Sequence, residues 1–81
     1  MNTFETSHDT PSGTLFVFPR ETSPEELLEF VTEMQSEGIP AEGYHPWWGD
    51  ATRVQHLMEL STGVAIGGCP FVISSTVRKA G

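Results

Sequence analysis

The sequence predicts a small α+β domain in which two helices pack on one face of a three-stranded, mostly antiparallel sheet. The length of 81 residues suits one domain with a small core. Two segments carry apolar residues at helical spacing, and short β-branched or aromatic runs lie between Gly and Pro residues. The segments follow one another in the order β-α-α-β-β, for which two layers are the most economical architecture.

The first residues predict a flexible arm followed by a strand. Residues 1–13 are polar and end in Pro-Ser-Gly, which is typical of a loose N-terminal segment. Residues 14–81 are then expected to form a single α+β domain. Residues 14–18 form an apolar, β-branched and aromatic run that is closed by Pro19, so they predict a central strand with both faces covered.

The clearest predicted element is a helix over residues 24–37. Ser23 suits the N-cap, Pro24 suits the first helical position, and Glu26 completes a capping box. Gly38 suits the left-handed position after the helix, and Pro40 prevents its continuation. The apolar residues expected on the buried face are Leu27, Phe30, Val31 and Met34, with Leu28 beside them.

A second helix is expected after an aromatic-rich connection over residues 39–49. Asp50 can cap this helix, which is expected to run to about Leu60 and to end at Gly63. Its expected buried stripe consists of Ala51, Val54, Leu57 and Met58.

The C-terminal part predicts a β-hairpin. Residues 62–66 and 69–77 read as two strands around a turn at Gly67 and Gly68. Pro70 favours an edge position for the last strand, because proline cannot donate to the ladder of a central strand. An alternative ends the second helix later and contains no hairpin.

The charge balance narrows the classes of ligand. The chain has 4 basic and 11 acidic residues and a formal net charge of −7. This composition disfavours direct binding of nucleic acid or of an anionic membrane, since both require Lys and Arg. No apolar run approaches the length of about 18–20 residues that a membrane helix needs, and no secretory signal is visible, so a cytoplasmic location is expected. A basic protein partner is compatible with the charge.

The first predicted helix carries a row of carboxylates without basic neighbours. Glu25, Glu29, Glu33 and Glu37 recur at a spacing of four residues, with Glu26 alongside. The row advances by roughly 18 Å, a length over which one nucleic-acid strand presents about five phosphates. It therefore suits a surface of Lys and Arg that normally contacts phosphates. The alternatives are a solvated face that maintains solubility and, less consistent with the spacing, a site for a hard cation.

The predicted connection contains three large aromatic residues, Tyr44, Trp47 and Trp48. Adjacent side chains of an extended segment point to opposite sides, so one Trp can fill the core while the other is exposed as an interaction anchor. One alternative is that both Trp rings fold onto the sheet. A base-stacking platform is a weaker alternative, since Arg53 is the only basic residue nearby.

Catalytic and metal sites lack a supporting signature. Cys69 and three histidines (His8, His45 and His56) could form a Cys–His pair or a zinc site, but no motif supports either. Cys69 is expected to be a small buried apolar residue, and His56 to lie at the surface. We therefore expect no metal, no cofactor and no enzymatic activity. The Gly-Gly before Cys69 also resembles the leader–core junction of modified-peptide precursors, an alternative that a folded upstream region disfavours.

These features favour a small, acidic, non-enzymatic binding protein that occupies a basic, nucleic-acid-handling surface of a larger host complex. In its small size, acidity and lack of a catalytic signature, the chain resembles the inhibitors that phages and mobile elements make against host defence, of which anti-CRISPR proteins are the best-known group. The alternative is a structural or regulatory subunit that uses the aromatic loop and a sheet edge to form a homodimer or to join a larger complex. The residues expected to bind the partner are Glu25, Glu26, Glu29, Glu33, Glu37, Tyr44, Trp47 and Trp48.

Overall fold

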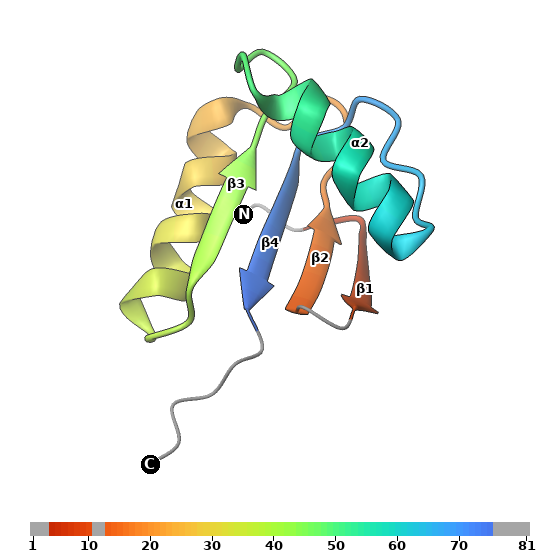
Figure 1. The fold of residues 1–81 in the computed structure, drawn as a ribbon. Helices are drawn as coiled ribbons and strands as arrows, with labels where there is room; N and C mark the ends of the chain where they lie inside the picture. The colour runs from red at the N-terminus through yellow and green to blue at the C-terminus, as the bar shows by residue number, and fades with distance from the viewer. Residues whose placement is uncertain (1–3, 11–12, 76–81) are drawn as a thin grey trace.

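The computed structural model describes residues 4–10 and 13–75, which fold into two helices and four strands (Figure 1). Every pair of neighbouring strands is antiparallel, and the strand order in the sheet is β1-β2-β4-β3. The α+β class and the two helices are as predicted, whereas the sheet has four strands in place of three. The elements in chain order are β1 (Thr6–Thr10), β2 (Gly13–Val17), α1 (Pro24–Ser36), β3 (Ala41–Tyr44), α2 (Ala51–Thr62) and β4 (Phe71–Ser75).

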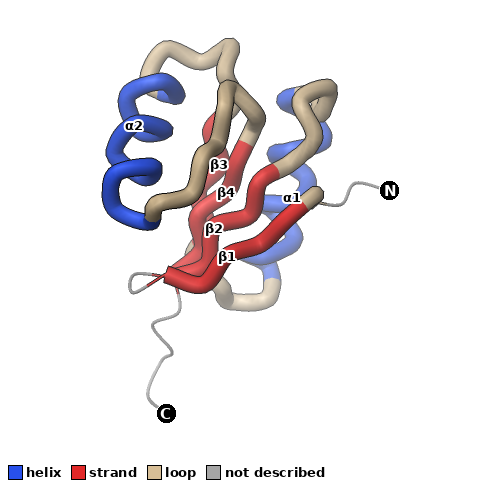
Figure 2. Tube along the Cα trace, turned by 90° about the vertical axis from the view of Figure 1, so that its right-hand side faces the viewer, coloured by secondary structure: helices blue, strands red, loops and turns tan. Residues whose placement is uncertain are grey.

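The two helices cover opposite faces of the sheet (Figure 2). Leu15 and Val17 of β2 pack on the α2 side with Ile66 and Phe71. The α1 side holds a second cluster of buried residues, namely Phe18, Leu27, Val31, Ala41 and Val72. The prediction that both helices pack on one face is therefore wrong. The physical reason is that β2 and β4 are apolar at successive positions, so each of their two faces needs a cover.

Part of the expected N-terminal arm is a strand of the sheet. Residues Thr6–Thr10 pair with β2, from Thr6 opposite Val17 to Thr10 opposite Gly13. The polar composition that suggested an arm is tolerated because β1 is an edge strand. Phe4 lies before the strand, and its ring centroid is 4.8 Å from that of Phe16, which anchors this end of the chain. Residues 1–3 and 11–12 of the expected arm lie outside the described residues.

Helix α1 has the predicted start and end. The Ser23 side chain accepts a hydrogen bond from the Glu26 backbone N–H, and the Glu26 side chain accepts one from the Ser23 N–H. At the other end, the N–H groups of Gly38 and Ile39 donate to carbonyls of the last turn, with Gly38 in the left-handed conformation at φ 83°. Leu27 and Val31 are buried, while Leu28 is 48% exposed.

The strand β3 lies within the segment expected to be a connection. It has four residues, and its Gly43 lies close to α1: a Cβ at this position would be 3.0 Å from the Cγ2 of Val31. A strand this short, with a Glu and a Gly at its centre, lacks the apolar alternation that sequence reasoning relies on.

Helix α2 ends as predicted but differs from the prediction on its buried face. Gly63 ends it in the left-handed conformation at φ 77°, and Asp50 occupies the N-cap position without a side-chain cap bond. Leu57, expected in the buried stripe, is 58% exposed.

The predicted C-terminal hairpin is wrong, since residues 63–66 form a loop. The last strand is central, between β2 and β3, and not at an edge. Pro70 is compatible with this position because it directly precedes β4, and its carbonyl accepts a hydrogen bond of 2.8 Å from the Phe18 N–H. Residues 76–77 of the expected strand lie outside the described residues. No helix in the described part of the chain is long and apolar enough to span a bilayer.

Candidate functional site

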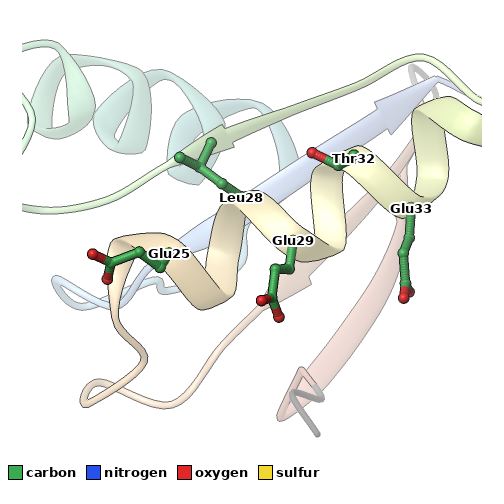
Figure 3. A pocket seen from close by; sticks show the side chains of 5 residues that line it. All are labelled: Glu25, Leu28, Glu29, Thr32 and Glu33. Carbon is green, nitrogen blue, oxygen red and sulfur yellow. The ribbon is translucent and has the colours of Figure 1, made fainter.

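The outward face of α1 presents the predicted carboxylates. All five of the expected glutamates are exposed. Three of them line a shallow hollow of about 500 Å³ together with Leu28 and Thr32, namely Glu25, Glu29 and Glu33. In Figure 3, Glu29 and Glu33 project to the same side of the helix, Glu25 points toward its N-terminal end, and Leu28 and Thr32 lie on the other side. The outward face of α1 thus combines the partly exposed Leu28 with three carboxylates, of which only those of Glu29 and Glu33 project to the same side.

The remaining two glutamates differ from these three in position. The Glu26 carboxylate accepts the Ser23 N–H at 3.1 Å, so it takes part in the helix cap. Glu37 is the C-cap residue, one turn beyond the hollow. The predicted row of five equivalent carboxylates is therefore three around a hollow, one in a cap and one at the helix end.

The carboxylates of Glu25, Glu33 and Glu37 form no ion pair within the described ranges 4–10 and 13–75. Arg20, the nearest base in sequence, donates a hydrogen bond of 3.1 Å to the Gly67 carbonyl. Two other bases of the chain, Arg78 and Lys79, lie outside the described residues. The negative charge of these three side chains is thus exposed to solvent on the described surface.

The aromatic loop has one exposed indole ring. Trp47 is 79% exposed, whereas Trp48 is half-buried against the α1-side cluster. This matches the expectation that one Trp fills the core and the other is exposed. Tyr44 stacks on Phe71 with ring centroids 5.2 Å apart, and its hydroxyl donates to the Glu42 carboxylate at 2.8 Å. This hydrogen bond, together with burial, raises the pKa of Tyr44 above its ordinary value of 10.0. Because its ring stacks on Phe71 beside the α2-side cluster, Tyr44 is chiefly a packing residue.

His45, to which sequence reasoning gave no role, joins this loop to α1. It is 2% exposed, and its Nδ1 accepts the Trp47 backbone N–H at 3.3 Å. Its Nε2 lies 2.8 Å from the Thr22 carbonyl oxygen. Because a backbone N–H can only donate and a carbonyl can only accept, the geometry assigns the ring proton to Nε2. Thr22 precedes the N-cap Ser23, so this contact places Trp47 and the first turn of α1 at the same end of the molecule (Figure 1).

The signal for His45 was present in the sequence. It stands two residues before Trp47 in a segment where Tyr44, Trp47 and Trp48 are crowded together. Crowding by apolar rings favours burial of the imidazole, and a buried imidazole needs a partner for each of its two nitrogens. Its imidazole is also close to both indoles, with ring centroids 4.8 Å from Trp47 and 5.9 Å from Trp48.

Glu59 of α2 also has a defined environment. Its Oε2 accepts the backbone N–H groups of Ile66 at 2.7 Å and Gly67 at 3.3 Å, which lowers the pKa of Glu59 below its ordinary value of 4.5. Gln55 accepts the Gly68 N–H in the same way at 3.2 Å. These side chains fix the loop before β4 and leave Glu59 turned away from the outer surface of α2.

The candidates for catalysis and metal binding are not brought together. Cys69 is half-buried and packs against the α2-side cluster, and His56 is exposed on α2. No group of three His, Cys, Asp or Glu side chains that could hold a metal ion occurs among residues 4–10 and 13–75.

Comparisons with protein-family models, with curated proteins and with solved structures found no match to this chain. The function is therefore inferred from the geometry of the site alone.

Proposed function

We propose that this chain is a small, acidic, non-enzymatic binding protein that occupies a basic, nucleic-acid-handling surface of a larger complex. The observation that supports it most is the His45–Thr22 hydrogen bond of 2.8 Å. This bond fixes an exposed Trp next to the start of a helix whose outward face carries carboxylates and no base. The proposed contact surface therefore runs from Trp47, which retains the partner, along the α1 carboxylates, which attract it.

The carboxylates supply attraction and orientation. Exposed charges of one sign steer a partner of opposite sign and mainly raise the association rate, an effect that falls as salt rises. Glu25, Glu29 and Glu33 can also accept the paired N–H groups of a guanidinium, as a phosphate does. A surface that normally binds the phosphates of one strand offers Arg and Lys at a comparable spacing, which is the sense in which α1 imitates nucleic acid.

Trp47 supplies the contact that slows dissociation. The buried His45 ring accepts the Trp47 backbone N–H and contacts the exposed indole, with ring centroids 4.8 Å apart, so the backbone that carries this side chain is already ordered before a partner covers it. Tryptophan is among the residues that most often dominate interface energies. The expected partner surface is therefore a basic groove with an apolar pocket at one end.

Within this proposal, the biological role is that of a counter-defence inhibitor from a phage or another mobile element, of the anti-CRISPR type, acting in the cytoplasm. Small size, acidity and the absence of a catalytic motif support this role by analogy of class. No cofactor, metal, nucleic acid or membrane is part of the proposed mechanism.

The test is capture followed by competition. The immobilised chain is exposed to host lysate at two ionic strengths, and each captured protein is then assayed for displacement of duplex DNA or RNA by fluorescence anisotropy. We expect a nucleic-acid-binding protein that is captured at low salt, is lost at high salt, and releases its nucleic acid when the chain is added.

Two double variants each replace two acidic residues by Lys, so they change the net charge by the same amount at different places on the surface. Glu29→Lys with Glu33→Lys is expected to weaken capture at low salt at least tenfold, because it places two cations on the proposed contact. Glu5→Lys with Asp9→Lys changes the net charge equally at two exposed residues near the N-terminus, and this variant should capture the partner as the parent does. Equal capture by both double variants, or capture that salt does not affect, would contradict the proposal.

A further inference from the structure

The outer edge of β3 presents backbone groups that point away from the sheet. β3 lies at one end of the strand order, with β4 as its neighbour. The Ser75 N–H donates to the Pro40 carbonyl at 3.0 Å, and hydrogen-bonded pairs alternate along an antiparallel ladder. Glu42 is therefore a residue that bonds to β4, whereas the N–H and carbonyl groups of Ala41 and Gly43 point outward.

Gly43 is the open position of this edge. It is partly exposed, and within the described ranges 4–10 and 13–75 no hydrogen bond engages its N–H or its carbonyl on the side away from β4. The Ala41 carbonyl, by contrast, accepts a hydrogen bond of 3.0 Å from the Gln35 side chain. An extended chain along this edge would satisfy both groups of Gly43, since one residue of an antiparallel strand supplies a donor and an acceptor.

Helix α1 flanks this edge with an exposed apolar side chain. The bond between Gln35 and Ala41 places one side of α1 at the edge, and Leu28 lies two turns before Gln35 on that side. In Figure 3, Leu28 and Thr32 lie on the side of the helix opposite to Glu29. Leu28 is 48% exposed. A strand added to β3 would therefore cover apolar surface on α1 as well as pair its backbone.

Both elements at this edge are acidic. Their residues, 24–36 and 41–44, include no base and five glutamates, namely Glu25, Glu26, Glu29, Glu33 and Glu42. Side chains alternate along a strand and Ala41 belongs to the α1-side cluster, so the Glu42 side chain lies on the opposite face of the sheet. A residue that stood opposite Glu42 in an added strand would share this face, where Lys or Arg would pair with the carboxylate.

We propose that the outer edge of β3 binds an extended segment of the partner protein as a fifth strand, in which apolar residues alternate with Lys or Arg. The apolar side chains pack against Leu28, and a basic side chain pairs with Glu42. This inference rests on the proposed function in taking the partner to be basic, and it adds the conformation in which the partner is bound.

The acidity of α1 distinguishes this occupant from a second copy of the chain. Antiparallel pairing of two β3 strands about a two-fold axis would place two acidic α1 helices side by side, which like charges disfavour. The strand at the opposite edge, β1, is polar throughout, so it offers an added strand little apolar surface.

The experiment titrates the full chain with a seven-residue peptide that alternates Val and Arg, and follows backbone amides by NMR. A Val opposite Gly43 shares its α1 side, so the N–H of each Val faces the edge and the N–H of each Arg points away. At saturating peptide, exchange of the Gly43 N–H with solvent should slow by about tenfold or more. Exchange rates in β1 should not change.

Two N-methylated forms of the peptide separate strand pairing from charge. Methyl groups on the Val amides remove the donors that face Gly43, so this form should bind about tenfold more weakly or worse. Methyl groups on the Arg amides leave those donors in place, and this form should bind within about threefold of the unmethylated peptide. The two forms carry the same charge, so attraction alone cannot tell them apart.

A matched pair of chain variants tests the α1 side of the contact. Leu28→Lys removes the apolar contact and brings a cation to the edge, so it should weaken peptide binding by about fivefold or more. Leu57→Lys on α2 changes the net charge equally and should bind within about twofold of the parent. Both leucines are exposed, so the fold should be retained, which circular dichroism checks.

Three results would overturn the proposal. The first is a Gly43 N–H whose exchange is unchanged at saturating peptide. The second is a Val-methylated peptide that binds as tightly as the unmethylated one, which would indicate attraction by charge alone. The third is slow exchange of the Gly43 N–H without peptide, either increasing with chain concentration or lost when residues 76–81 are deleted, which would assign the edge to a second copy or to the chain's own C-terminus.

Capture from lysate separates this inference from the proposed function. A chain that binds the peptide at β3 but captures no nucleic-acid-binding protein would contradict the proposed function alone. Capture of such a protein without slower exchange at Gly43 would contradict the strand contact alone.

Discussion

His45 fixes the position of Trp47 because both of its ring nitrogens are engaged with backbone groups. One bond reaches the Thr22 carbonyl across the fold, and the other holds the Trp47 N–H within the loop. Buried donors and acceptors contribute through the cost of leaving them unsatisfied more than through the bond itself. A single imidazole thus links the loop to the start of α1.

His45→Ala should therefore lower the free energy of unfolding by about 2–4 kcal/mol, because it leaves two backbone groups unpaired and opens a cavity between Thr22 and the indoles. Urea denaturation followed by Trp fluorescence measures the change. His56→Ala removes an exposed histidine and should stay within about 0.5 kcal/mol of the parent. A loss of equal size in both variants would contradict the role of His45.

The lowered pKa of Glu59 predicts that the stability of the protein depends on pH. Its pKa is lowered in the folded state by the Ile66 and Gly67 N–H groups, so the unfolded chain binds a proton more readily than the folded one. The stabilisation is complete above the ordinary value of 4.5 and is lost as the pH falls through the lower folded value. Unfolding midpoints measured from neutral pH to below pH 4 should fall less steeply for Glu59→Gln than for the parent. The matched control Glu33→Gln removes an exposed carboxyl and should retain the parent slope.

At the scale of the elements, close backbone packing determines which strands tolerate substitution. Gly13 lies in β2 opposite Ser75 of β4, with φ 153°. A Cβ at this position would collide with the Ser74 carbonyl oxygen. The glycine is thus required by the approach of one strand to another.

Gly13→Ala should destabilise the protein by about 3 kcal/mol or more, since a backbone clash adds to the cost of an unfavourable conformation. Thermal unfolding followed by circular dichroism measures this loss. Gly49→Ala is the matched control, because nothing lies within 4 Å of the added Cβ, and its melting temperature should be close to that of the parent. If Gly13→Ala has the same melting temperature as this control, the two strands separate more easily than the structure indicates.

The elements that the sequence predicted are those with local signals. Helix α1 has its capping box, its proline and its glycine, and its bounds follow from them. β1 and β3 could not be predicted in the same way, because edge strands tolerate polar residues and the hydrogen bonds that define them come from distant segments. The carboxylates of the candidate site were visible in the sequence, whereas the His45–Thr22 contact joins residues 23 positions apart and follows only from the fold.

At the scale of the whole molecule, the sheet separates two helices of different chemistry. The strands that form its centre, β2 and β4, supply apolar side chains to both faces, and each helix covers one of them. The prediction of two layers failed here, although the apolar character of residues 14–18 on both faces already indicated a cover on each side. The same separation puts the exposed glutamates of α1 on one side of the sheet and the exposed Leu57 and Leu60 of α2 on the other.

The place of β4 in this sheet sets the order in which a growing chain can complete its fold. β4 is the last strand in sequence, yet it lies between β2 and β3 and pairs with both. While a ribosome is still synthesising the first 62 residues, β2 and β3 have no shared neighbour, and the edge of β2 that pairs with β4 is open. Folding of this domain must therefore wait until Ser75 has left the exit tunnel, and a nascent chain that stalls earlier exposes unpaired strand edges to the cell's chaperones and proteases.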